Sequence, residues 1–186
     1  IKHSATGNDL SAVQNTIKSN GIKIRNFLNS NGLGGNDIAG RRLEVTDLLA
    51  QAYRQNGAAQ SRYIISEVIS VRSNNVNAVD AAYQKSGELL SQNVSLISEQ
   101  NQSPIEYIYT GLNDIKPEMI AEATKSAREA AQQFAADSGA KVGGIRNAYQ
   151  GVFQILPRDS DNSYQERQSR YKTVRVVSTI KFDIKN

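Results

Sequence analysis

The stretch "AREAAQQFAADSGAKVGGI" at residues 127–145 changes from an alanine-rich helical pattern to an extended one. Apolar side chains recur at helical spacing from Pro117, which suits a first helical turn because its missing N–H would be unbonded there. Gly139 stands where a left-handed helix end favours a residue without Cβ. The pattern predicts a helix from about Pro117 to Ser138 that leads into a strand starting at Lys141.

One face of this helix is expected to pack on a sheet, with alanines allowing close approach. Its residues are Met119, Ile120, Ala123, Ala127, Ala130, Phe134 and Ala135. The following strand, residues 141–156, contains Gly143, Gly144 and Gly151, which mark bulges or positions where the helix backbone comes close. A phosphate-binding loop is not indicated, because no Gly-Lys-Ser/Thr ending is present.

The chain ends in an alternating pattern, "VRVVSTIKFDI" at residues 174–184. Apolar residues at every second position predict a strand with one buried and one wet face, as in an antiparallel sheet. The polar residues 157–170 before it are interpreted as an exposed connection between paired strands. Packing of the helix face on residues 145–155 and 174–184 follows from these patterns.

The first third of the chain predicts a helix and a hairpin. Residues 8–31 carry apolar side chains at three- and four-residue spacing, with Asn8 or Asp9 as the N-cap and Gly32 after the end. Gly21 weakens this helix by about 1 kcal/mol relative to alanine, so a kink or break is expected there. Residues 40–54 and 61–72 are rich in β-formers, and the Asn56-Gly57 pair between them suits a hairpin turn.

The middle of the chain is predicted to repeat the order helix, strand, strand. Residues 75–92 form the helix, and residues 93–99 and 103–111 read as short strands. The helical face consists of Val76, Val79, Tyr83 and Leu90. The predicted fold class is therefore α+β, with antiparallel sheets, amphipathic helices on one face and repeated helix-strand-strand units. A subdivision into residues 1–75 and 76–186 is expected.

Composition excludes several classes of protein. The 186 residues contain no cysteine and one histidine, which rules out disulfides, thiolate metal sites and clusters of histidine ligands. The net charge of +4 arises from 22 basic and 18 acidic residues that are scattered along the chain, so it is read as solvated surface and no nucleic-acid partner is expected. No run of about 18 apolar residues is present that could span a bilayer.

Residues suited to chemistry are few. His3 lies near a start that is expected to be frayed, which argues against histidine catalysis. Glu118, Glu122 and Glu129 stand at helical spacing beside Lys125 and Arg128 and are interpreted as a solvated ion-pair face. Separately, a pair of tyrosines that shares a face with an isoleucine is either a sheet-to-helix core or a stacking surface for a ring. This group comprises Ile105, Tyr107 and Tyr109.

Residues 116–155, followed by the polar connection and "VRVVSTIKFDI", resemble the C-terminal half of the SIMPL-domain family. The shared features are a long alanine-rich helix, a small-residue cap, a Lys-Val-Gly strand entry and a final alternating strand. Residues 4–38 resemble that family's first helix and glycine-ended loop. The resemblance implies one domain over residues 1–186 that lacks its N-terminal strand or strands, since only "IKHSAT" precedes the helix.

The resemblance further implies a bacterial cell-envelope protein in the periplasm, associated with the outer membrane or peripherally with a membrane, linked to oxidative-stress defence, and inclined to form homo-oligomers. It supplies no catalytic, cofactor-binding or metal-binding residue, and none is assigned. Exposed strand edges, guarded only partly by basic side chains, favour the same assembly reading. Those side chains are Lys172, Arg175, Lys181 and Lys185.

Two function classes remain after this reading of the sequence. The first is a non-catalytic envelope protein that assembles with copies of itself. The second is a module that binds a small ligand or an anion at a helix N-terminus, for which Lys116 and Pro117 mark a candidate end. An enzyme is the third and least favoured reading, and no cofactor or metal is expected.

Overall fold

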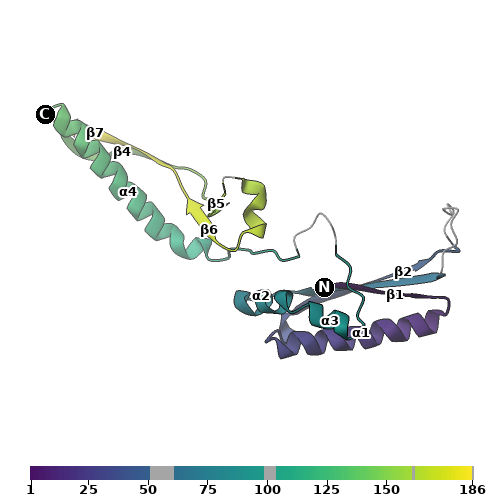
Figure 1. Ribbon diagram of the computed structural model, residues 1–186. Coiled ribbons are helices and arrows are strands. Elements are labelled where there is room, and N and C mark those ends of the chain that lie inside the picture. Colours follow the sequence, from purple (N-terminus) through teal and green to yellow (C-terminus); the bar gives the residue numbers. More distant parts are fainter. Residues whose placement is uncertain (51–60, 99–103, 161, 186) are drawn as a thin grey trace. The chain divides into compact units, whose positions relative to one another are not determined.

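The computed structural model describes residues 1–50, 61–98, 104–160 and 162–185 (Figure 1). The predicted α+β class with antiparallel pairing is confirmed. The chain divides into two compact units, Ile1–Pro104 and Ile105–Asn186. The division therefore falls after Pro104, whereas the sequence suggested a boundary after residue 75, because the helices that follow residue 75 contribute to the first unit's core.

The first unit is built on a three-stranded antiparallel sheet. Strand β3 (Tyr63–Val71) is central, between β1 (Lys2–Gly7) and β2 (Ile38–Asp47). A short 3-10 turn, η1 (Gly35–Asp37), precedes β2. The predicted pairing of β2 with β3 is confirmed, whereas the Asn56-Gly57 turn lies outside the described residues. Strand β1 was not predicted, because a six-residue segment carries too little periodicity to identify it.

Helix α1 (Leu10–Ser30) packs on β1 and β3 (Figure 1). The Asp9 side chain caps it by accepting the Ala12 N–H at 3.0 Å, and Gly32 follows the end with φ of +79°. Both features were predicted. The kink expected at Gly21 is wrong, because the helix continues through this residue, which is buried and packs close to a side chain of β3.

Residues 75–98 close the first unit with two helices, α2 (Val76–Gln84) and α3 (Gly87–Ser91). The strands expected at residues 93–99 and 103–111 do not form in the described parts of those segments, so the second helix-strand-strand unit is wrong. The backbone of residues 95–97 pairs with the outer edge of β1. The Ser4 N–H donates to the Ser95 carbonyl at 3.1 Å, and the Ile97 N–H donates to the Lys2 carbonyl at 2.8 Å.

The hydrophobic core lies between these helices and the sheet. Ala82 and Leu89 are buried from α2 and α3, whereas Tyr83 and Leu90 are exposed, because the chain breaks between the two helices and the predicted single face is lost. The main cluster consists of Ile24, Phe27, Leu28, Leu33, Ile69, Ala82, Leu89 and Val94. A second cluster consists of Val13, Ile17 and Ile65.

The second unit combines one long helix with two short ladders (Figure 1). Helix α4 (Leu112–Asp137) packs on β4 (Lys141–Gln150) and β7 (Ser178–Lys185), which pair antiparallel. Strands β5 (Gln154–Pro157) and β6 (Lys172–Arg175) form the other ladder, joined through the 3-10 helix η2 (Ser163–Gln168). The continuous strands expected at 141–156 and 174–184 are each divided in two.

Helix α4 begins five residues earlier than predicted, so Pro117 lies inside it and not in its first turn. Its end is as predicted, with Gly139 at φ of +71°. The predicted buried face is partly wrong, because Phe134 is 77% exposed and Ile120 is also exposed. The face toward the strands repeats at every fourth residue and ends at the buried Ala135, which turns Phe134 away.

The predicted bulge in β4 is confirmed, since the pairing with β7 shifts between Val142 and Ile145. The close neighbour is the partner strand and not the helix: a Cβ at Gly143 would lie 3.0 Å from the Asp183 carbonyl oxygen. A Cβ at Gly151 would likewise lie 2.7 Å from the carbonyl oxygen of Val177, the residue before β7. These glycines therefore serve strand pairing.

Candidate functional site

A buried polar cluster crosses the sheet of the first unit. His3 and Glu67 are fully buried, and His3 Nε2 lies 2.8 Å from Glu67 Oε2. The other carboxylate oxygen pairs with Arg41 Nε on β2, whose side chain is 48% exposed. One side chain from each strand therefore meets at Glu67. The expectation of a frayed start around His3 is wrong, because β1 is paired on both of its edges.

The electrostatics of this cluster favour a neutral histidine. A carboxylate only accepts hydrogen bonds, so Nε2 donates its proton to Glu67. His3 Nδ1 is buried without a partner among the described residues. Burial first, and then the positive charge of Arg41, lowers the pKa of His3. Protonation would add a second positive charge to an enclosed site, which is costly.

The absence of a side chain at Gly21 lets helix α1 lie close to the Glu67 carboxylate. A Cβ at this position would lie 2.9 Å from Glu67 Oε2 and 3.8 Å from Arg25 Nη1. Contacts below about 3 Å are repulsive, so a side chain here would displace the carboxylate from His3. Because His3 and Glu67 are wholly enclosed, the role of this cluster that the structure shows is to join the three strands.

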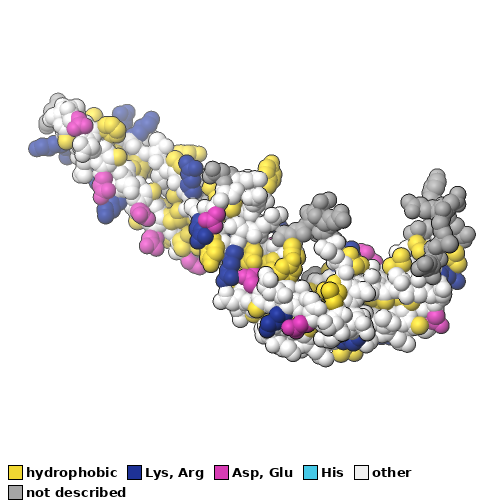
Figure 2. Space-filling model, viewed as in Figure 1, with side chains coloured by type: hydrophobic (Ala, Val, Ile, Leu, Met, Phe, Trp, Pro, Cys, Tyr) yellow, Lys and Arg dark blue, Asp and Glu magenta, His cyan; other side chains and the backbone are white. Residues whose placement is uncertain are grey.

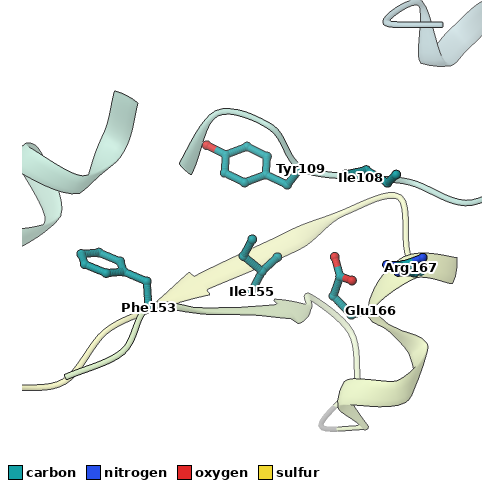
Figure 3. A pocket seen from close by; sticks show the side chains of 6 residues that line it. All are labelled: Ile108, Tyr109, Phe153, Ile155, Glu166 and Arg167. Carbon is teal, nitrogen blue, oxygen red and sulfur yellow. The ribbon is translucent and has the colours of Figure 1, made fainter. Parts of the chain in front are cut away.

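The second unit has a shallow pocket of about 260 Å³ (Figure 3). In Figure 3 Ile108 and Tyr109 lie on one side of the space, opposite Phe153, Ile155 and Glu166. Arg167 is the sixth lining residue. The volume lies below the roughly 300–1,000 Å³ of typical small-molecule sites.

The charged groups of this pocket already have partners. Glu166 Oε1 lies 2.7 Å from Lys172 Nζ, and Arg167 Nη1 lies 3.3 Å from Glu106 Oε2. Lys116 Nζ sits 5.7 Å from the Phe153 ring centroid. A ligand would therefore meet an apolar wall and no free charge, and the pocket gives little support to specific binding of a small polar molecule.

The predicted anion site at Lys116 and Pro117 is not at a helix end. Helix α4 begins at Leu112, so these residues lie beyond its first turn, where the backbone is no longer an orphan donor. Among the tyrosines, Tyr109 lines the pocket and Tyr107 donates its backbone N–H to the Arg167 carbonyl at 2.7 Å. Neither lies on a strand, which corrects that part of the prediction.

Two of the predicted charged residues of α4 form an ion pair on the helix surface. Lys125 Nζ lies 3.9 Å from Glu129 Oε1, in the exposed ion-pair arrangement that was predicted for this face. Arg128 instead lies over the Phe182 ring, at 4.9 Å from its centroid. Within residues 1–50, 61–98, 104–160 and 162–185, no group of three His, Cys, Asp or Glu side chains could hold a metal ion. No helix formed by the described residues is long and apolar enough to cross a membrane.

The clearest unusual feature is an uncovered apolar surface on the second unit, which we call the open face. Its members are exposed large apolar side chains of α4, β4, β7 and the adjoining loops, and they point to more than one side of the unit. They are Ile120, Phe134, Ile145, Tyr149, Val152, Val177 and Ile184. Figure 2 shows hydrophobic side chains spread along the surface of this unit. Of its described residues, only Ala135, Gly143 and Pro157 are buried.

The strands that carry the open face also have open edges. Strand β7 pairs with β4 alone, and within the described residues no further strand joins either one. The expected protection by basic residues is weaker than predicted, because Lys172 lies on β6 and its side chain is nearly buried against Glu166. Only Lys181 and Lys185 stand on β7 itself. Natural proteins usually protect such edges or pair them with another chain.

Fold and surface together define an α+β protein of two units, one with a closed core and one with an apolar face left uncovered. The sequence profile of the SIMPL family, described as a protein of unknown function (DUF541), matches residues 1–182. The chain therefore belongs to the SIMPL family, as its sequence resemblance indicated. None of the curated proteins compared with the chain matches it.

Proposed function

We propose that this protein acts by assembling with copies of itself, and that the second unit supplies the contact. The observation that carries the proposal is the open face: a unit of about 80 residues leaves these seven large apolar side chains exposed, and Ala135 and Pro157 are the apolar residues that it buries among those described. Apolar surface left exposed to this extent favours an interaction with another chain. A stable contact buries about 1,000 Å² or more, which an exposed helix and ladder could supply.

A second copy is the simplest occupant of the open face. A two-stranded ladder alone is marginal in water and needs further strands or packing against a helix. Helix α4 packs on β4 and β7, but no further strand of the described residues joins this ladder. A copy of the same chain supplies both the missing strands and apolar side chains. The proposal gives the protein a structural role and no catalytic one.

Location and role in the cell form a further part of the proposal. We propose a periplasmic, envelope-associated protein that contributes indirectly to stress defence. This part is supported by the family resemblance alone. Fractionation of the native cells tests it, with recovery in the cytoplasmic fraction as the contradicting result.

The second candidate function is a ligand-binding module that uses the pocket beside Tyr109 and Phe153. Its support is the apolar lining, and its weakness is the small volume and the paired charges. A bound ligand at 100 times its dissociation constant would raise stability by about 2.7 kcal/mol. A thermal-shift screen with small amphipathic molecules distinguishes this candidate from assembly.

The test of assembly is the mass of the full chain in solution. Light scattering across micromolar concentrations should give a multiple of 20.4 kDa that persists at physiological salt. Added salt should not dissociate the oligomer, because salt screens interactions between surface charges but does not weaken apolar burial. A strictly monomeric mass would remove the assembly proposal and promote the ligand-binding one.

A further inference from the structure

Strand β7 is paired with β4 along one edge, and no strand of the described residues pairs with its other edge. The pairing shifts between Val142 and Ile145 and between Ile145 and Asn147 both place the additional residues on β4. Strand β7 itself therefore runs without interruption over its eight residues. Because bulges disrupt a ladder and discourage further pairing, β7 is the better template for another strand.

The two faces of β7 differ in character. Ile180 and Phe182 are partly buried on the side of α4, where the Arg128 guanidinium lies over the Phe182 ring. Ile184 continues this side but is 70% exposed. Lys181 and Asp183 are exposed on the opposite side and have no ion-pair partner among the described residues.

We propose that β7 pairs antiparallel with β7 of a second copy, about a two-fold axis at Phe182. This inference rests on the proposed self-assembly and names the surface that would carry it. In this register Lys181 stands opposite Asp183 of the second copy, and symmetry makes the same pair twice. Ile180 stands opposite Ile184 on the other face, so charge meets opposite charge and apolar meets apolar.

Neighbouring registers fail on the same criteria. An axis at Lys181 places two lysines directly opposite each other, and an axis at Asp183 does the same with two aspartates. Registers whose axis falls between residues place Lys181 opposite an apolar side chain of the helix-facing side. An axis at Ile184 would also pair opposite charges, Asp183 with Lys185, but it would leave most of β7 unpaired. The register centred on Phe182 therefore satisfies both criteria over the greatest length of the strand.

The pairing also covers one exposed member of the open face, Ile184. Two ladders joined through β7 form a four-stranded antiparallel sheet in the order β4-β7-β7-β4, with both α4 helices on one face. Opposite residues of an antiparallel pair point to the same side, so the exposed Ile184 would lie beside Ile180 of the second copy. This sheet exceeds the two strands that are marginal alone.

Charge reversal tests the register. Lys181→Asp or Asp183→Lys alone places like charges opposite each other twice, and should weaken dimer formation about tenfold or more. The double variant Lys181→Asp/Asp183→Lys restores opposite charges and should recover the wild-type dimer. Lys125→Asp makes the same change in net charge on the exposed side of α4 and is the matched control, which should leave the dimer unchanged.

Cysteine pairing tests the same contact by geometry, because the chain has no cysteine of its own. Opposite residues in an antiparallel ladder have Cα atoms about 4.5–5.5 Å apart, within the about 4.4–6.8 Å that disulfides span. Lys181→Cys protein mixed with Asp183→Cys protein should form linked dimers under mild oxidation. Thr179→Cys mixed with Asp183→Cys is the control and should not.

The outcomes separate this inference from the proposed function. Charge rescue together with the specific disulfide supports pairing through β7. An oligomer that persists without either effect overturns this register while self-assembly stands. A monomer at every concentration overturns both.

Discussion

The two units of this chain differ in how many of their apolar side chains they bury. The first unit encloses a cluster of eight buried hydrophobic residues between two layers and ties its three strands together at Glu67. The second unit has a longer helix and more strands, yet it leaves Phe134 and Ile184 in water. Secondary structure of similar length is therefore covered in one unit and left largely exposed in the other.

The largest expected difference concerns truncation of apolar side chains. Leu28→Ala empties part of the first unit's core and should lower its free energy of unfolding by about 2–5 kcal/mol. Phe134→Ala in the second unit should change the monomer's stability by less than about 0.5 kcal/mol and weaken assembly instead. Urea titration followed by amide signals of each unit measures both. Equal losses in the two variants would contradict the comparison.

A smaller effect is expected at two helical glycines of the first unit. Gly21→Ala places a Cβ against Glu67 Oε2, and should cost about 1–3 kcal/mol although alanine is the better helix former. Gly87→Ala is the control, since no atom lies within 4 Å of its added Cβ, and it should be neutral or slightly stabilising. If Gly21→Ala proves stabilising, the packing of α1 against Glu67 is incorrect.

The smallest effect is a pH dependence confined to the first unit. Burial and then Arg41 lower the pKa of His3 below the unfolded value of about 6.5. As pH falls through 6.5 the unfolded chain takes up a proton that the folded chain resists. The first unit should therefore be most stable above pH 6.5 and lose stability below it.

The control for this pH dependence is His3→Gln, which keeps a donor toward Glu67 but does not titrate. Between pH 7.5 and 5.5 its stability should fall less steeply than that of the wild type, measured on β3 amides in urea. Burial also lowers the pKa of the Ile1 amino group, but this group is common to both proteins and cancels. Identical slopes would show that His3 is not held neutral by the fold.

The sequence predicted those features that depend on local pattern. Helix α1 with its Asp9 cap, the β2–β3 pairing and the left-handed Gly139 follow from periodicity and backbone preference, which neighbouring residues determine. The predicted anion site at Lys116 was wrong because Pro117 lies inside α4 and does not mark its start. A single residue type therefore did not fix the boundary.

Long-range features could not be read in the same way. His3 is buried because β1 pairs with β3, where its partner Glu67 lies 64 residues further along the chain, and a six-residue segment carries no sign of that partner. Phe134 was assigned to a core because apolar residues are usually buried, but this unit lacks the layers that would cover it. Local pattern shows which side chains are apolar, whereas their burial depends on how much structure surrounds them.

The most direct test of the difference between the units is amide hydrogen exchange on the full chain at a series of protein concentrations. Amides of β3 should show the same protection throughout, because their unit is closed by its own core. Protection of β4 and β7 should rise with concentration, as a second copy covers the open face. Protection of β4 and β7 that equals that of β3 and does not change with concentration would contradict the account.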